Sequence, residues 1–241
     1  AASAPVALTV GTDGQVLVAC STCTSGLTWG TVSAAQATPT TLGTVYGFIG
    51  AGLAGSVGLG ICALDKVANT NIANVAIGAK AMCSQTGFCH MNVAVGVLAL
   101  MADTCSSGNT AVGGQAMCNA RCSINNVAIG ALSMYSGGFG TNVLSFNTVA
   151  GYGVAGSLGN TGPACANVII GASAANTQTQ GDRNVAIGPG VTLASLTGSC
   201  QLALGFSPTD NWLTGDSTKA IKPGAGIVDC AGLCGTAGQV L

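Results

Sequence analysis

The sequence contains no glutamate, a single histidine (His90), and only 5% charged residues among its 241. Its seven acidic residues are aspartates that stand singly, which leaves little material for acid–base catalysis. Six Lys and Arg residues and a net charge of -1 cannot neutralise a run of phosphates, so no nucleic-acid partner is expected. Aromatic residues make up 4% of the chain, too few to fill a core with bulky side chains. The interior is therefore expected to pack with Ala, Val, Ile and Gly.

Cysteine, in contrast, is abundant, with 12 residues in the chain. This number favours an oxidising, extracellular location, and disulfides are preferred to zinc because the tightest pairs lie at opposite ends of the chain. Cys105 and Cys122 each fall nine residues after a repeat glycine, which predicts that they lie in one column on neighbouring coils. The competing local pairs are Cys20 with Cys23, Cys83 with Cys89, Cys118 with Cys122, and Cys230 with Cys234. The sequence leaves the connectivity open.

One stretch, Leu42–Leu64, is uncharged and long enough to span a bilayer. Seven of its residues are glycine, and no basic flank sets an orientation. A membrane span is therefore not expected.

The strongest pattern is an internal repeat of the form Asn-Val-Ala-Ile-Gly, or a close variant of it. Its clearest copies begin and end at Asn74 and Gly78, Asn92 and Gly96, Asn109 and Gly113, Asn126 and Gly130, Asn167 and Gly171, and Asn184 and Gly188. With degenerate copies the series has nine terminal glycines, from Gly60 to Gly205, spaced 17 to 21 residues apart. Such a period predicts an all-β parallel solenoid of about nine coils.

Each block is expected to form a short strand, because β-branched residues alternate with alanine before a glycine turn. We expect Val75 and Ile77 to face the interior of the coil, and Ala76 to face a partner chain. The asparagines are expected to stack their amides from coil to coil. A second apolar column, which includes Met82 and Met134, is expected to be a second strand that fills the core.

These blocks, for example Asn74–Gly78 and Asn184–Gly188, resemble the head repeats of YadA-type trimeric autotransporter adhesins. The resemblance covers Ser56–Gly205 and implies a left-handed parallel β-roll in which three chains share a centre lined by small residues. It also implies a role in host attachment. The coils here are longer than those of the family, so additional loop residues must protrude.

The flanking segments resemble tail fibres of phages and fibre-like surface proteins of large DNA viruses. Gly11–Leu17 carries this resemblance, together with Gly26–Gly30, and Gly235–Leu241 repeats the first motif at the other end of the sequence. We therefore expect a joint between units, or a piece of a longer array. The expected divisions are a cap or junction at 1–35, a linker or first coil at 36–55, the solenoid at 56–206, and a second cap or junction at 207–241.

Two motifs in the sequence suggest catalytic alternatives. A step of 18 residues also suits the left-handed β-helix of hexapeptide acyltransferases, whose catalytic base is a histidine, but the other steps break this phase and His90 lies in a Cys-flanked turn. Gly151–Gly156 matches the dinucleotide motif G-x-G-x-x-G, without a following helix pattern or acid.

The expectation is therefore a non-enzymatic fibre or surface-appendage subunit, bacterial or viral, with no cofactor or metal. Its partners would be further copies of itself, as a homotrimer or a head-to-tail filament, and a host receptor or glycan contacted by outward loops. The alternative is a secreted enzyme such as an acyltransferase.

Overall fold

The computed structural model describes residues 12, 15–19, 27–31, 47–48, 55–65, 73–84, 89–102, 104–135 and 143–224. The chain divides into two units, Ala1–Val45 and Tyr46–Leu241. In the first unit, β1 (Gln15–Ala19) and β2 (Leu27–Thr31) form an antiparallel pair. All regular structure in the described part of the chain is strand, turn or bend, so the protein is all-β.

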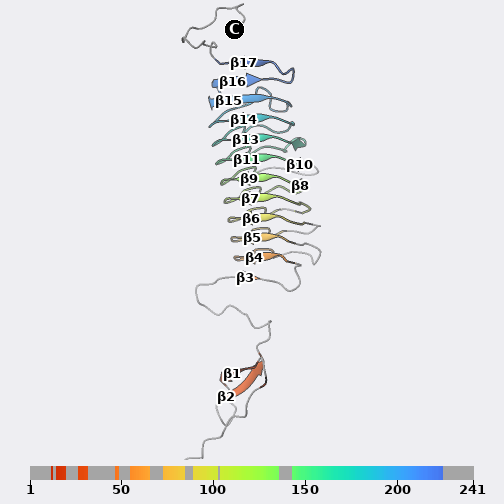
Figure 1. Cartoon of the computed structure of the whole chain (residues 1–241), viewed down its shortest axis with the longest axis vertical. Coiled ribbons are helices and arrows are strands. Elements are labelled where there is room, and N and C mark those ends of the chain that lie inside the picture. Colours follow the sequence, from red (N-terminus) through yellow and green to blue (C-terminus); the bar gives the residue numbers. More distant parts are fainter. Residues whose placement is uncertain are drawn as a thin grey trace, which may run out of the picture. The chain divides into compact units, whose positions relative to one another are not determined.

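The second unit is a β-solenoid, built on a sheet of twelve strands (Figure 1). Nine of these strands pair in parallel, each with the corresponding strand of the next coil: β4 (Val57–Leu59), β5 (Val75–Ile77), β6 (Val93–Val95), β7 (Thr110–Val112), β9 (Val127–Ile129), β11 (Thr148–Ala150), β13 (Val168–Ile170), β14 (Val185–Ile187) and β15 (Leu202–Ser207). The predicted fold class is therefore confirmed. We call this series the main ladder.

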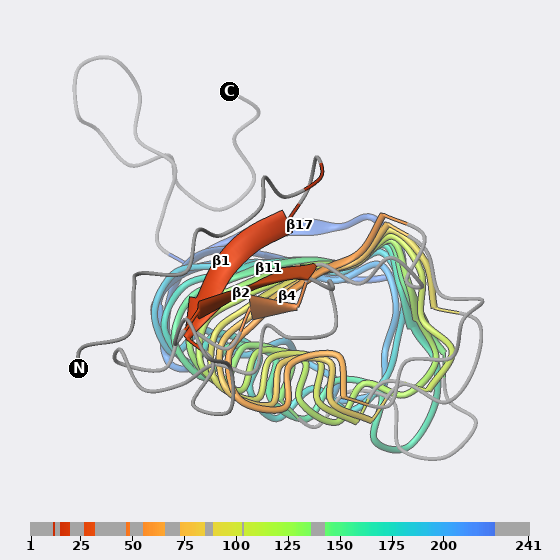
Figure 2. The same cartoon turned by 90° about the horizontal axis from the view of Figure 1, so that it is seen from below.

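The main ladder is in register from its first coil to its last. Ala76 pairs with Ala94, and Ala111 pairs with Ala128, so equivalent positions of the repeat stack directly. Viewed along the stacking direction, the coils superimpose (Figure 2). The differences in repeat length are therefore absorbed outside the strands.

A smaller parallel sheet precedes the asparagine of three consecutive coils, and the sequence pattern did not predict it. It consists of β8 (Ser123–Ile124), β10 (Leu144–Ser145) and β12 (Ala164–Cys165). Isolated bridges from His90 to Ser107, and from Ser107 to Ile124, continue the same pairing toward earlier coils.

The column of Met82, Leu100, Met117 and Met134 lies in turns, not in the predicted second strand. These residues adopt φ values of 49° to 51°, in the left-handed region, where a strand cannot continue. Their amides still bond to the next coil, as Met82 N does to the carbonyl of Ala99 at 3.0 Å. The side chains are completely buried, so the prediction that they fill the core is confirmed.

The interior of each coil is filled by pairs of complementary size. A Cβ added at Gly58, in the middle of β4, would lie 3.2 Å from Cδ1 of Leu64, so the middle strand position faces the turn residue four after the terminal glycine. Where the middle residue is alanine, this turn residue is large, in Ala76 with Met82, Ala94 with Leu100, Ala111 with Met117, and Ala128 with Met134. Where it is large, the turn residue is alanine, in Val149 with Ala155 and Ile169 with Ala175. These six coils thus conserve the volume of their core.

This complementarity predicts a compensated exchange. Ala128→Ile should overfill the coil and destabilise it by about 2 kcal/mol, and Met134→Ala should leave a cavity and cost about 3 kcal/mol. The double variant reproduces the Ile169 and Ala175 pair, so its loss should be smaller than the sum by about 2 kcal/mol. Urea unfolding of the four proteins measures this coupling, and strictly additive losses would contradict the pairing.

Antiparallel strands lie at both ends of the main ladder. At the first end, β3 (Gly47–Phe48) pairs with β4. At the other end β15 pairs with β16 (Asp210–Gly215), which pairs with β17 (Ile221–Pro223). Because Gly224 N bonds inward to the carbonyl of Trp212, the preceding residue, Pro223, presents its nitrogen to the edge of β17 that faces away from β16, where it cannot donate a hydrogen bond. This edge, with Lys222 beside the proline, resists the addition of another strand. The terminal copy Gly235–Leu241 lies outside the described residues, so its role as a joint stays a prediction.

Candidate functional site

The asparagines that recur in the repeat form a continuous buried column. Asn126 is typical: its Oδ1 accepts from both the backbone N and Nδ2 of Asn147, at 2.9 Å each. Its Nδ2 donates to Oδ1 of Asn109 at 3.0 Å, and to the carbonyl of Leu144 at 2.9 Å. The same backbone-to-side-chain bond recurs at each step through Asn74, Asn92, Asn109, Asn126, Asn147, Asn167 and Asn184. These residues hold the coils together and are buried away from any ligand.

The column ends on two other polar side chains. Ser56 Oγ accepts from Asn74 N at 3.0 Å, and Gln201 N donates to Oδ1 of Asn184 at 2.9 Å. The degenerate copies of the repeat thus end the amide stack without leaving a buried group unpaired at either point.

The terminal glycines form a second structural column. Their φ values lie between +121° and +139°, a region that other residues adopt only with strain, at Gly78, Gly96, Gly113, Gly130, Gly171 and Gly188. A Cβ at Gly78 would lie 2.6 Å from the carbonyl carbon and oxygen of Gly96. The role of these glycines is therefore close stacking of the backbone.

The main candidate for a functional surface is the outer side of the main ladder. The first and third residues of each strand point away from the core: Val57, Leu59, Val75, Ile77, Val93, Val95, Thr110, Val112, Val127, Ile129, Thr148, Ala150, Val168, Ile170, Val185, Ile187, Leu202 and Leu204. We call this set the outer strip. Ile77 is 38% exposed and Ile129 47%. Nine strands about 4.8 Å apart make it about 40 Å long.

The expected orientation of these strands is therefore wrong. Ala76, Ala94, Ala111, Ala128, Ala186 and Ala203 face the core, at 0–1% exposure, and the valines and isoleucines face outward. The reason is the small interior, where the turn residues Met82 and Met134 leave room only for a methyl group opposite them. The uncovered face is consequently larger and more apolar than the predicted alanine face.

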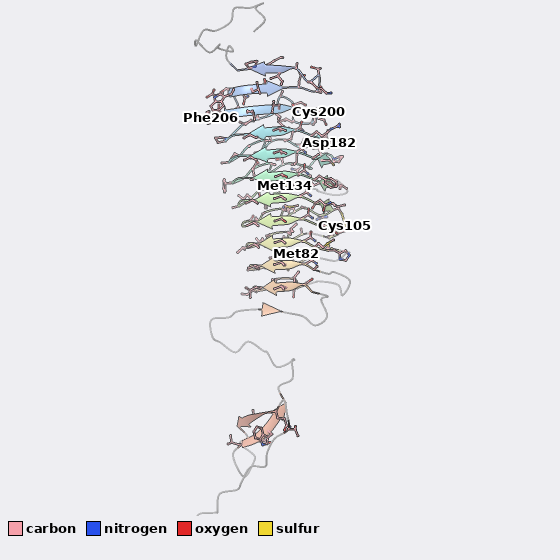
Figure 3. The ribbon with its side chains drawn as sticks, in the orientation of Figure 1. Met82, Cys105, Met134, Asp182, Cys200 and Phe206 are labelled. Carbon is pink, nitrogen blue, oxygen red and sulfur yellow. A yellow bond between two sulfur atoms is a disulfide. The ribbon has the colours of Figure 1, made fainter. Side chains whose placement is uncertain are left out.

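No charged side chain belongs to the outer strip, which holds two threonines and otherwise only apolar residues. A contiguous exposed apolar surface of this kind is unusual on a monomer and is typical of an interaction site. The described charged residues lie elsewhere, as Asp182 does among turn residues (Figure 3).

A disulfide joins Cys105 to Cys122, with their Cα atoms 5.0 Å apart on neighbouring coils. These are the two cysteines that the spacing placed in one column. Cys105 lies along the same edge of the stack as Asp182 and Cys200, opposite Phe206 (Figure 3). The bond ties two coils together outside the core.

The disulfide excludes one of the competing local pairs. Cys118 cannot bond to Cys122, because Cys122 is already bonded, and Cys118 is buried at 4% exposure. Cys83 is half-buried, and Cys89 is completely buried beside the asparagine column, where its carbonyl accepts from Asn74 Nδ2. Cys20, Cys23, Cys230 and Cys234 lie outside the described residues.

Two of the remaining thiols are poor nucleophiles. Burial raises the pKa of Cys118 above its usual range. Burial, together with the neighbouring carboxylate of Asp182, raises the pKa of Cys165, whose backbone N donates to Asp182 Oδ1 at 2.8 Å. Because a raised pKa lowers the thiolate fraction at neutral pH, neither is suited to nucleophilic catalysis.

His90 and Gly151–Gly156, which carry the two catalytic alternatives, both lie within the stacked coils. His90 is half-buried, and its carbonyl accepts from Gly108 N in the next coil at 3.0 Å. Gly151–Gly156 lies in the turn after β11, with no helix following it in the described part of the chain. Among the described residues no three His, Cys or Asp side chains converge on a metal position. Nor does any helix in those residues have the length and apolarity to cross a membrane.

One hollow opens on the turn side of the coils, and sequence reasoning missed it. Its volume is about 430 Å³, and it is lined by Leu132, Tyr135, Tyr152, Gly153, Gly156, Ser157, Ser173 and Asn176. We call it the Tyr152 groove. The signal for it was Gly153, a glycine at a position where the neighbouring coils carry side chains.

Comparison with family models, curated proteins and solved structures found no match.

Proposed function

We propose that this chain is a subunit of an extracellular fibre or surface appendage, in which three copies associate through the outer strip. The observation that carries the proposal is the uncharged apolar surface that runs along the whole main ladder. Exposing such a surface to water costs free energy. A second and a third copy offer surfaces of the same length and spacing that can cover it. Association through it would leave the turns and loops facing outward.

The resemblance of the repeats to YadA-type heads supports three copies. In a threefold arrangement of these coils, the shared centre would be lined by the outward valines and isoleucines, not by the alanines. The Cys105–Cys122 disulfide supports an oxidising compartment. A stiff ladder with few charges, closed by capping strands, suits a rod that presents its loops to a host receptor. We assign it no catalytic step and no cofactor.

The test is to place charge on the outer strip. Val112→Glu with Ile129→Glu should convert a trimer to monomers, because two carboxylates per chain would otherwise be buried without partners. Sedimentation velocity gives the mass, and far-UV circular dichroism checks that each monomer keeps its coils.

The control is Gln115→Glu, which adds a charge in the turn of the same coil and should leave the trimer intact. Replacing Ala111 and Ala128 with Glu is not an informative test, because both residues lie in the core and the coils themselves would unfold. An outer-strip variant that sediments as the unmodified protein does would overturn the shared-face proposal.

A further inference from the structure

We propose that the Tyr152 groove binds a neutral carbohydrate. The inference deepens the proposed function by naming the ligand of an outward surface, and it rests on that function for its biological meaning. Binding itself requires only the folded coils.

The groove arises because one coil lacks an outward side chain at Gly153, where an added Cβ would meet only Ser173 Oγ, at 3.9 Å. Gly153 stands in the column that holds Leu98, Gln115 and Leu132 in earlier coils, and Gly156 stands in the column that holds Tyr135 and Asn176. The backbone at Gly153 has the same left-handed conformation as its neighbours, with φ of 58° against 59° at Leu132. The hollow is therefore a missing side chain in a regular stack, not a deformation of the coil.

The walls combine aromatic and polar groups in the way that sugar recognition requires. Tyr152 is 61% exposed and Tyr135 is half-buried, so a phenol ring is available for the apolar face of a pyranose. Asn176 is exposed, and its Oδ1 accepts from Gly156 N at 3.1 Å, which orients the amide and leaves its NH2 group to donate to a hydroxyl. Ser157 and Ser173 add hydroxyl groups.

The charge of the groove selects the ligand class. Its lining contains no Asp, Lys, Arg or His, so a sialylated or sulfated glycan would gain no ion pair there. The volume of about 430 Å³ falls within the usual range of small-molecule sites, but this site is an open groove, suited to one or two rings of a longer glycan.

The backbone of the groove is already fixed without ligand. Gly153 N bonds to the carbonyl of Ala131 at 2.9 Å, and Ser173 N bonds to the carbonyl of Tyr152 at 2.8 Å. The backbone therefore loses little conformational entropy on binding, which favours binding even through a small contact area. Three grooves per trimer would strengthen attachment through multivalency.

The experiment is saturation-transfer-difference NMR on the full chain, with maltotriose, triacetylchitotriose and N-acetyllactosamine as neutral probes and sialyllactose as the charged probe. We expect at least one neutral probe to bind with a dissociation constant of about 1 mM, and sialic acid to add nothing. Tyr152→Ala should weaken binding about fivefold. Gly153→Leu should abolish it, since leucine already occupies this conformation at Leu98 and Leu132 and would fill the groove.

The matched control is Gly190→Leu. Gly190 occupies the same column with φ of 64°, and a Cβ there would meet only Pro208 Cδ, at 3.9 Å. This variant should bind as the unmodified protein does. No binding of any neutral probe, or equal binding by Gly153→Leu and Gly190→Leu, would overturn the proposal.

The native mass of each variant separates this inference from the proposed function. A monomeric protein that still binds sugar would contradict the proposed trimer and would support the carbohydrate site in the groove. If Tyr152→Ala alone dissociated the assembly, Tyr152 would belong to the shared face, and the carbohydrate proposal would fail.

Discussion

Replacing Gly113 with alanine is expected to unfold the coils around it at room temperature, or to cost about 4 kcal/mol or more of unfolding free energy. Two effects add. The residue has φ of 136°, which alanine adopts only under strain. Its new Cβ would also lie 2.5 Å from the carbonyl carbon and oxygen of Gly130, and both are backbone atoms held by the ladder.

The adjacent Gly114 is the control for this substitution. A Cβ at Gly114 meets nothing within 4 Å, so Gly114→Ala should change the stability by less than about 0.5 kcal/mol. Urea unfolding followed by circular dichroism compares the two. Equal stabilities of the two variants would contradict the close stacking of the glycine column.

Replacing Asn126 with alanine is expected to cost about 4 kcal/mol, because it interrupts the amide column at its centre. The change removes the acceptor of the Asn147 backbone N and the donor to the Leu144 carbonyl. Both groups are inside the coil, and a buried polar group left without a partner costs more than a hydrogen bond contributes. Thermal unfolding of the variant measures the loss.

Asn119→Ala is the comparison for the asparagine column. Asn119 is half-buried in a turn, and its backbone N, which bonds to the Tyr135 carbonyl, is unaffected by the change. Its loss should stay below about 1 kcal/mol. If Asn126→Ala were as stable as Asn119→Ala, the column would not be what holds the coils together.

Much of the fold could be predicted from the sequence, because every coil repeats the same local chemistry. The period locates the main strands, and a glycine at a fixed position indicates a special backbone conformation. The one-coil offset between Cys105 and Cys122 predicts that the two lie in one column, which agrees with their Cα separation of 5.0 Å.

The orientation of the strands could not be predicted in the same way. Alternation shows that Ala76 and Ile77 lie on opposite faces, but it does not show which face is inside. The decision depends on the width of the coil, which is set by residues such as Met82 across the core. The sequence does indicate the orientation when coils are compared. One coil pairs a small Ala128 with a large Met134, and another pairs a large Ile169 with a small Ala175, so the middle strand residue must face the turn residue across the core.

The turns and the Tyr152 groove were missed for a related reason. Non-glycine residues such as Leu132 and Met134 adopt left-handed conformations that their identity does not indicate. They do so because hydrogen bonds from coil to coil impose one backbone path on every repeat. Only once that path is known does Gly153 become a gap in a column of side chains.

The native mass of the unmodified protein tests the central claim most directly. If two further copies cover the outer strip as proposed, sedimentation equilibrium under non-reducing conditions should give three times the chain mass of 23.1 kDa. A mass of 23.1 kDa at micromolar concentration would show that the strip stays exposed, and would contradict the account of the protein as a trimeric fibre subunit.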